Sequence, residues 1–199
     1  MVKKNKSNCG SSGNSRIPMP YTLNTLIRKA YKDLPVNNYA ILFCFGNSLV
    51  SRLIMAKTRL EAEEIVPSHT AILVRGNDGI IFIYESTTLS QKIHGKRIPS
   101  GVRRYLFSDF KTLEKNKMTT YYLATDKTAT AIDSSYELER WVGYPYGLDS
   151  IIDFALKDES DGESNGLICS QYANKVFGLV REDCPSPAEL WRILYNEKQ

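Results

Sequence analysis

The sequence predicts an α+β fold in which an antiparallel sheet packs against helices. Three short apolar runs rich in β-branched and aromatic residues, at 39–45, 69–75 and 80–87, indicate strands. Apolar residues at helical spacing over 169–180 indicate a helix that begins at a cysteine. The chain has 199 residues, of which 42% are hydrophobic, so it is long and apolar enough for one domain with a proper core.

The first elements are expected to be a helix, a strand and a second helix. Residues 21–31 carry apolar residues at helical spacing, and this helix is expected to end before Pro35. The apolar run at 39–45 has the length and composition of a buried strand. Ser48 follows it and is a candidate N-cap for a helix over 49–64.

The next two strands are expected to pair as a hairpin, and two registers are open. If residues 77–79 form a three-residue loop with Gly79 in the left-handed region, Glu85 lies opposite Ala71 and shares a face with His69. A two-residue loop shifts the register by one residue and turns Glu85 to the other face. Only the first register brings the carboxylate within reach of the imidazole.

The remaining segments are less regular. Residues 88–117 are polar and are expected to be mostly loop, with a turn or short helix at 108–110. A further strand is predicted at 119–125, a helix at 128–143 and a closing helix at 188–196. An acidic loop at 157–166 then precedes the cysteine helix, and it is expected to be mobile.

Composition limits the partners and the location of the protein. Residues 1–20 are polar and predict a flexible N-terminal arm, which leaves 21–199 as a single domain. The arm has no apolar region after its lysines, so no signal peptide is expected and the location is cytoplasmic or virion-associated. No apolar window is long enough for a transmembrane span. A net charge of +4 on scattered Lys and Arg predicts no nucleic-acid binding.

Three residues carry a candidate chemistry. Cys169 stands at a helix start, where unpaired amides and the helix dipole stabilise a thiolate, although an inert core thiol fits the same pattern. His69 enters one strand and Glu85 ends the next. A thiol, an imidazole and an orienting carboxylate are the parts of a cysteine nucleophile. For Glu85 the alternative is a salt bridge to Arg103.

Metal binding is not expected. The four cysteines lie at wide, irregular spacing, and only two histidines are present, so no zinc pattern occurs. His94, in a basic polar loop, is expected to be exposed to solvent. The chemistry outlined above also requires no metal or organic cofactor.

Five short motifs together resemble one family. They are Ser-His-Thr-Ala-Ile-Leu at 68–73, Ile-Tyr-Glu-Ser at 83–86, Tyr-Pro-Tyr-Gly at 144–147, Ile-Cys-Ser-Gln-Tyr-Ala at 168–173 and Ser-Pro-Ala-Glu-Leu at 186–190. Their order resembles the circularly permuted, YiiX-like branch of the NlpC-type papain-fold proteins, over about residues 38–190. The resemblance implies a permuted papain-like fold with the nucleophile at a helix N-terminus.

The same resemblance implies a role for each site residue. Cys169 would be the nucleophile, His69 the general base and Glu85 the orienting acid. Tyr146 would support the oxyanion hole beside the Cys169 amide, with Tyr144 the second choice. The chain departs from the family pattern in two places: a glutamine at 171, where the family commonly has Cys-Ser-Glu, and the long acidic loop before the nucleophile.

The implied function is that of a cysteine hydrolase, an amidase or peptidase that acts through a thioacyl-enzyme without a cofactor. Its expected substrate is a peptide or another amide, such as a peptidoglycan peptide of a cell wall. Two alternatives stay open. One is a lipid acyltransferase or esterase of the same permuted fold, although that group usually has Asn-Cys-Glu-His-Phe where this chain has Ile-Cys-Ser-Gln-Tyr. The other is a phage virion protein that keeps the fold for binding and contacts an assembly partner through its N-terminal arm.

Overall fold

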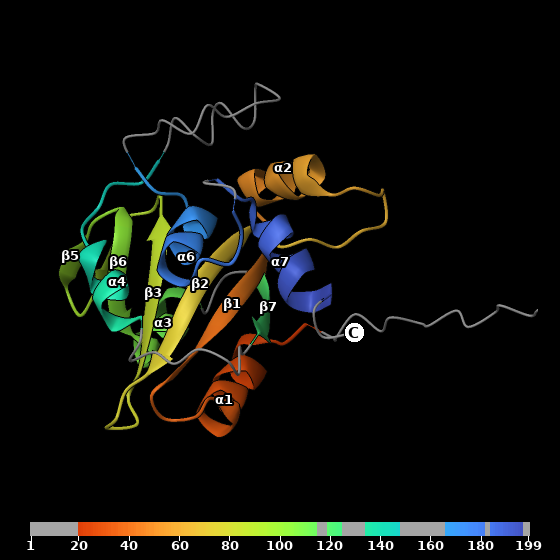
Figure 1. Ribbon diagram of the computed structural model, residues 1–199. Helices are drawn as coiled ribbons and strands as arrows, with labels where there is room; N and C mark the ends of the chain where they lie inside the picture. The colour runs from red at the N-terminus through yellow and green to blue at the C-terminus, as the bar shows by residue number, and fades with distance from the viewer. Residues whose placement is uncertain (1–19, 115–118, 125–133, 148–165, 182–183, 197–199) are drawn as a thin grey trace, which may run out of the picture.

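Five strands pair into one antiparallel sheet in the order β6-β3-β2-β1-β7 (Figure 1). They are β1 (Asn38–Gly46), β2 (His69–Arg75), β3 (Ile81–Thr87), β6 (Gly101–Leu106) and β7 (Thr119–Ala124). A separate two-stranded ribbon consists of β4 (Gln91–Ile93) and β5 (Lys96–Ile98). This computed structural model describes residues 20–114, 119–124, 134–147, 166–181 and 184–196.

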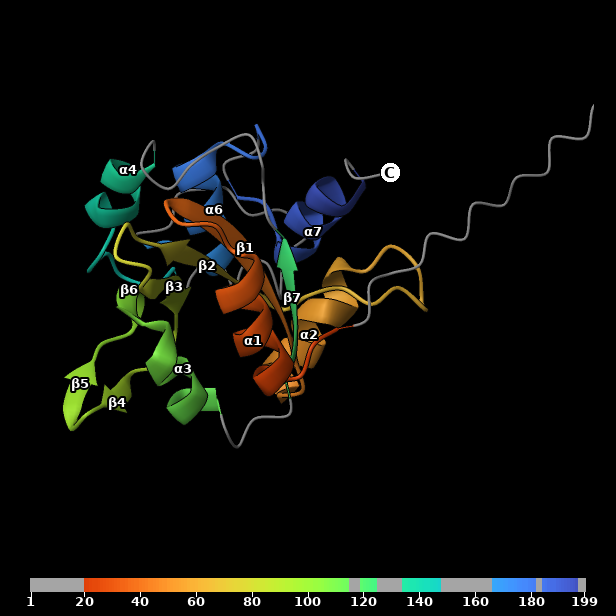
Figure 2. The same ribbon diagram turned by 90° about the horizontal axis from the view of Figure 1, so that it is seen from below.

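Helices cover both faces of the sheet. They are α1 (Leu23–Asp33), α2 (Leu49–Thr58), α3 (Phe107–Glu114), α4 (Ser135–Arg140), α6 (Cys169–Phe177) and α7 (Pro187–Asn196). Seen from below, α1 and α3 lie on one side of the sheet, and α4, α6 and α7 lie on the other (Figure 2). The predicted α+β class, an antiparallel sheet packed against helices, is therefore confirmed.

The central strand explains why the sheet holds two cores. All side chains from Tyr39 to Cys44 on β1 are buried, because helices cover both faces of the strand. Leu42 belongs to the core shared with α1 and α3, whereas Phe43 belongs to the core shared with α6 and α7. This is why β1 appears in the sequence as a continuous apolar run.

The β2–β3 hairpin has the three-residue loop of the first predicted register. Gly79 has φ +77, and the Gly76 N–H donates to the Ile80 carbonyl oxygen at 2.9 Å. Ala71 consequently pairs with Glu85. Side chains on the same face alternate along each strand, so this register gives Glu85 and His69 a common face.

The start of α2 was predicted correctly, but its end was not. Ser48 caps α2, because its side chain accepts from the Ser51 N–H at 3.0 Å. The predicted helix over 49–64 is too long, since α2 ends at Thr58. The Arg192 guanidinium of α7 explains the end, because it donates to the Thr58 carbonyl oxygen at 2.6 Å and to the Glu64 carboxylate at 2.8 Å.

The prediction of a short helix at 108–110 is confirmed by α3, but the prediction of mostly loop over 88–117 is wrong for the residues that the structure describes. This region also contains the β4–β5 ribbon and the edge strand β6. Strand β6 has buried residues at Gly101, Val102, Arg103 and Tyr105, so a charged residue stands within its inward-facing positions. Because of this residue, the sequence lacks the alternation of apolar and polar residues that predicts a strand.

Several predicted features lie partly or wholly outside the described residues. The N-terminal arm at 1–20 is described only at residue 20, and the acidic loop at 157–166 only at residue 166. Of the helix predicted at 128–143, the structure describes residues 134–143, in which α4 spans Ser135–Arg140.

Candidate active site

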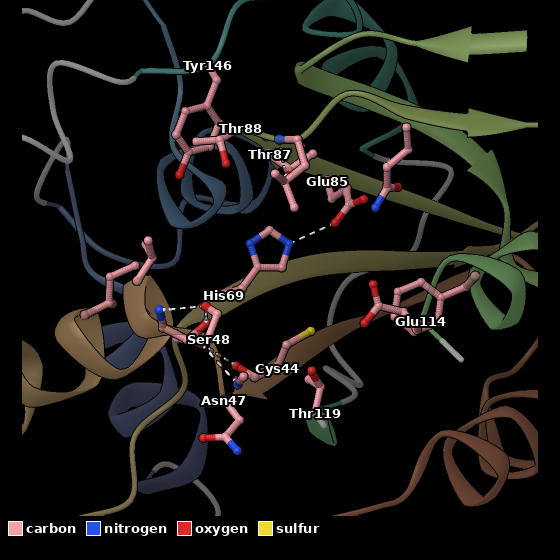
Figure 3. Close-up of a pocket in the computed structure, with 18 of the residues that line it drawn as sticks. Cys44, Asn47, Ser48, His69, Glu85, Thr87, Thr88, Glu114, Thr119 and Tyr146 are labelled. Carbon is pink, nitrogen blue, oxygen red and sulfur yellow. Dashed lines mark hydrogen bonds and ion pairs between the residues drawn. The ribbon is translucent and has the colours of Figure 1, made fainter. Parts of the chain in front are cut away.

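His69 and Glu85 meet at one end of the sheet. His69 is the first residue of β2, and Glu85 lies on β3. Nε2 of His69 is 2.9 Å from Oε2 of Glu85. Figure 3 shows this contact, with the second ring nitrogen directed away from Glu85. The predicted pairing of imidazole and carboxylate is therefore present in the structure.

The second oxygen of Glu85 has partners of its own. Arg103 donates to Oε1 from Nε at 3.0 Å and from Nη2 at 2.6 Å. The Tyr105 hydroxyl donates to the same oxygen at 2.9 Å. The two predicted alternatives, a hydrogen bond to the imidazole and a salt bridge to Arg103, thus occur together, one on each carboxylate oxygen. The side chains of Glu85, Arg103 and Tyr105 are all buried.

Cys169 completes the set from the other face of the sheet. It is the first residue of α6, which packs against β2 and β3. Its thiol lies close enough to the His69 imidazole for charge and hydrogen bonding to act between them, and the backbone N–H groups of Thr70 and Ser170 also favour the thiolate. Since Nε2 of His69 is bonded to Glu85, Nδ1 is the ring nitrogen left for the thiol.

These contacts favour a charged pair at neutral pH. Burial raises the pKa of the Cys169 thiol, but the charge and hydrogen bond of His69 and the two backbone amides outweigh it and lower the pKa overall. Burial lowers the pKa of His69, but Cys169 and Glu85 outweigh burial and raise it to about 10. Burial likewise raises the pKa of Glu85, whereas His69 and Arg103 hold it well below its usual range.

The segment that leads to Cys169 is fixed to the strand that carries Glu85. The Ser86 hydroxyl, on the residue next to Glu85, donates to the Leu167 carbonyl oxygen. The Ile168 N–H donates to Oε1 of Gln171 at 3.0 Å. A glutamine therefore supplies the acceptor that a glutamate would supply at position 171, and it does so without a negative charge beside the thiolate. The departure from the family pattern leaves this helix start intact.

Tyr146 is positioned by close backbone packing. The Leu167 N–H donates to the Pro145 carbonyl oxygen at 3.0 Å. A Cβ on Gly166 would come within 2.4 Å of the Tyr146 carbonyl carbon, so only glycine allows this approach. The Tyr146 side chain projects into the cavity beside His69 (Figure 3). Tyr144 instead packs edge-on against Trp141 and is 39% exposed.

The hydroxyl of Tyr146 is suited to donate a hydrogen bond. Burial raises its pKa well above the ordinary value, and the negative charge of Cys169 raises it further. The group therefore stays protonated at physiological pH. A neutral phenol at this place can donate to a developing oxyanion.

A cavity of about 620 Å³ opens beside these residues. Its lining includes His69, Glu85 and Tyr146, residues of α2, and residues 87–89 with Gln91. Cys169 is only 5% exposed and is not part of this lining.

Cys44 is a cavity residue that the sequence did not indicate. It pairs with His69 across β1 and β2, and its side chain lines the cavity. Strand β1 is apolar on both faces, so the sequence gives no sign of which face opens onto a site. The Cys44 side chain is only 7% exposed.

The other histidine is separate from this cluster. The His94 side chain is 80% exposed, as predicted, and its Nε2 is 2.9 Å from Oδ1 of Asp109. Within the described ranges, no group of three or more His, Cys, Asp or Glu residues could hold a metal ion. In the same ranges no helix is long and apolar enough to cross a membrane.

No family model matches this chain, and comparison with curated proteins and with solved structures gives no significant match. The function of the chain must therefore be inferred from the geometry of the four predicted residues. His69 bonds to Glu85, Cys169 interacts with the His69 ring, and Tyr146 lines the cavity beside them.

Proposed function

We propose that the protein is a thiol-dependent hydrolase that cleaves an amide bond through a Cys169-His69-Glu85 triad. The observation that carries this proposal is the place of the His69 ring, which bonds to the carboxylate of Glu85 through Nε2 and lies close enough to the Cys169 thiol to interact with its charge. An imidazole held in this way has one tautomer and one orientation, and both are required for proton transfer.

In the proposed acylation, the Cys169 thiolate attacks the carbonyl carbon of the amide and forms a C–S bond. The carbonyl electron pair moves to oxygen, and the oxyanion accepts hydrogen bonds from the Cys169 backbone N–H and the Tyr146 hydroxyl. The His69 imidazolium then gives its proton to the amide nitrogen, the C–N bond breaks, and the amine leaves. The product on the enzyme is a thioester at Cys169.

In the proposed deacylation, water replaces the amine. The now neutral His69 accepts a proton from water as the oxygen attacks the thioester carbonyl. The C–S bond breaks, the carboxylic acid leaves, and the thiolate and imidazolium are restored. Glu85 stays ionised throughout, because Arg103 and Tyr105 bond the oxygen that His69 does not use.

The fold behind this chemistry is, in our proposal, a circularly permuted papain-like fold. Its supports are the chain order His69, Glu85, Cys169, the nucleophile at the start of a helix packed on an antiparallel sheet, and the five family-like motifs. By the same resemblance we propose a peptide or other amide substrate, with cell-wall peptides the first class to assay.

Active-site labelling tests the proposal directly. The folded protein is treated with a peptide that carries a thiol-reactive electrophile, and the modified residue is mapped by mass spectrometry. We expect modification at Cys169 that is lost in His69→Ala and retained in Cys184→Ser, a matched thiol outside the cavity lining. Labelling of Cys44 with Cys169 untouched would overturn the assignment of the nucleophile.

A further inference from the structure

Helix α2 presents an unusual apolar surface to solvent. Leu49, Val50 and Leu53 are 68%, 57% and 58% exposed. Leu49 and Leu53 are four residues apart and so lie on the same face of the helix. In this helix only Thr58 is buried, so α2 contributes little to either core. An exposed aliphatic strip of this kind generally marks an interaction site.

The charged residues of α2 itself all have one sign. Arg52 and Lys57 are exposed and lie on the two sides of the Leu49–Leu53 line, and the helix contains no acidic residue. The long stems of Arg and Lys let such residues reach a charged layer while their apolar neighbours go deeper. Glu61 and Glu63, the nearest exposed acids along the chain, come after the helix has ended.

The strip also adjoins the candidate active site. Val50, Ser51 and Ile54 on α2 line the cavity that contains His69. Leu89, which is 54% exposed, lines the same cavity from the opposite side. A flat partner on α2 would therefore cover the region from which a substrate enters.

We propose that α2 docks onto a membrane surface with anionic headgroups and holds the cavity opening against it. We define the α2 surface as Leu49, Val50, Arg52, Leu53 and Lys57. An aliphatic strip flanked by cations is the pattern of a helix that lies in the headgroup region, with charge attraction added to apolar burial. The occupant is thus a lipid surface, and the substrates served are those that stand on or in it.

Vesicle co-sedimentation tests the docking without any turnover. The full chain with Cys169→Ala is mixed with vesicles of phosphatidylcholine alone or with added phosphatidylglycerol. We expect binding that needs phosphatidylglycerol and weakens with salt. The double variant Leu49→Asn with Leu53→Asn should lose about tenfold or more of the bound fraction. Arg52→Gln with Lys57→Gln should lose the preference for the anionic lipid.

Matched controls separate docking from general effects. Ile80→Asn removes an exposed aliphatic side chain at the β2–β3 turn, at the opposite end of the sheet from α2 (Figure 1), and should leave binding unchanged. In the chain with Cys169 intact, the Leu49 and Leu53 variants should leave turnover of a soluble amide unchanged, because neither residue lines the cavity.

Three results would overturn the docking proposal: no binding to either vesicle, binding that the α2 variants do not reduce, or a concentration-dependent dimer that the Leu49 and Leu53 variants abolish. The last result would assign the α2 surface to a second copy of the chain. Loss of the hydrolase activity alone would leave the vesicle result standing, so the two proposals fail separately.

Discussion

Arg103 on β6 lies directly opposite Glu85 on β3 and holds the carboxylate oxygen that His69 leaves free. The same guanidinium also donates to the Leu89 carbonyl oxygen at 2.8 Å and to the Gln91 side chain at 2.7 Å. A buried guanidinium with all these partners is fixed in place, and it fixes Glu85 in turn. The orientation of Glu85, and with it the contact of Glu85 with His69, thus depends on Arg103 as well.

Arg103→Met should destabilise the protein strongly. It removes one partner of a carboxylate that is 6% exposed, and removing one partner of a buried ion pair typically costs about 3–5 kcal/mol. Arg104→Met is the matched control, because Arg104 is the next residue, is half exposed, and pairs with Glu139 at the surface. Its cost should stay below about 1 kcal/mol. Urea unfolding of both variants measures the difference, and equal losses would contradict a special role for Arg103.

The reactivity of Cys169 should persist in mild acid. Its pKa is lowered by His69, so the thiolate persists below the ordinary thiol pKa of about 8.5. An unperturbed thiol loses about tenfold of its thiolate for each pH unit below its pKa. Iodoacetamide labelling at about pH 6, followed by peptide mapping, should therefore modify Cys169 first. Preferential labelling of Cys44 or Cys184 at this pH contradicts the ion pair.

At alkaline pH, the rate of amide turnover should fall while the rate of Cys169 alkylation should not. The pKa of His69 is raised to about 10, so the imidazolium is present below that pH and is lost as the pH rises through it. Amide cleavage needs this proton for the leaving nitrogen, and it should fall there, whereas alkylation of the thiolate should not. A pH–rate profile beside a pH–alkylation profile makes the comparison. Parallel profiles would show that His69 is not the acid.

The three triad residues should act as one unit. Cys169→Ala and His69→Ala should each remove most of the turnover, and the double variant should lose little more than either single variant. Glu85→Gln should lose less, because the amide can still bond to His69 although it lacks the charge that raises the pKa of His69. Measurement of kcat/KM for the single and double variants tests whether the losses are non-additive. Full activity in His69→Ala would end the triad proposal.

The sequence narrowed the position of Glu85 to two registers. In the one with a three-residue loop at 77–79, the two-residue period of a strand places Glu85 opposite Ala71, as the structure has it. Cys169 was predictable in the same local way, because the helix begins where the apolar approach ends. Both features depend on neighbours within a few residues along the chain.

The features that the sequence did not predict depend on distant partners. Arg103 is buried in an ion pair with Glu85. A charged residue at an inward-facing position breaks the apolar alternation that predicts a strand, so β6 was predicted as loop. The end of α2 is set by Arg192, which lies 134 residues further along the chain. The place of Cys44 in the cavity depends on which face of a doubly buried strand stays uncovered. Tertiary packing determines all three features, and the local sequence pattern carries no information about that packing.

Tyr146→Phe should lower kcat and leave KM nearly unchanged. The hydroxyl is proposed to bond only to the oxyanion, and removal of one such donor typically costs about 10²–10³ in kcat. Tyr144→Phe is the control, because Tyr144 lies against Trp141 and does not line the cavity. Steady-state kinetics on a soluble amide distinguishes the two tyrosines. A raised KM with normal kcat in Tyr146→Phe would make Tyr146 a substrate-binding residue instead.

Gly166→Ala should reduce turnover through Tyr146. The added Cβ would lie 2.4 Å from the Tyr146 carbonyl carbon and 2.5 Å from the Gly147 nitrogen, so the backbone that carries this tyrosine must move. A displacement of this kind misplaces the hydroxyl relative to the oxyanion and should lower kcat by at least about tenfold. If the effect passes through Tyr146, the double variant Gly166→Ala with Tyr146→Phe loses little more than the worse single variant. Losses that multiply would mean that Gly166 acts on Cys169 directly, through the Leu167 segment that it precedes.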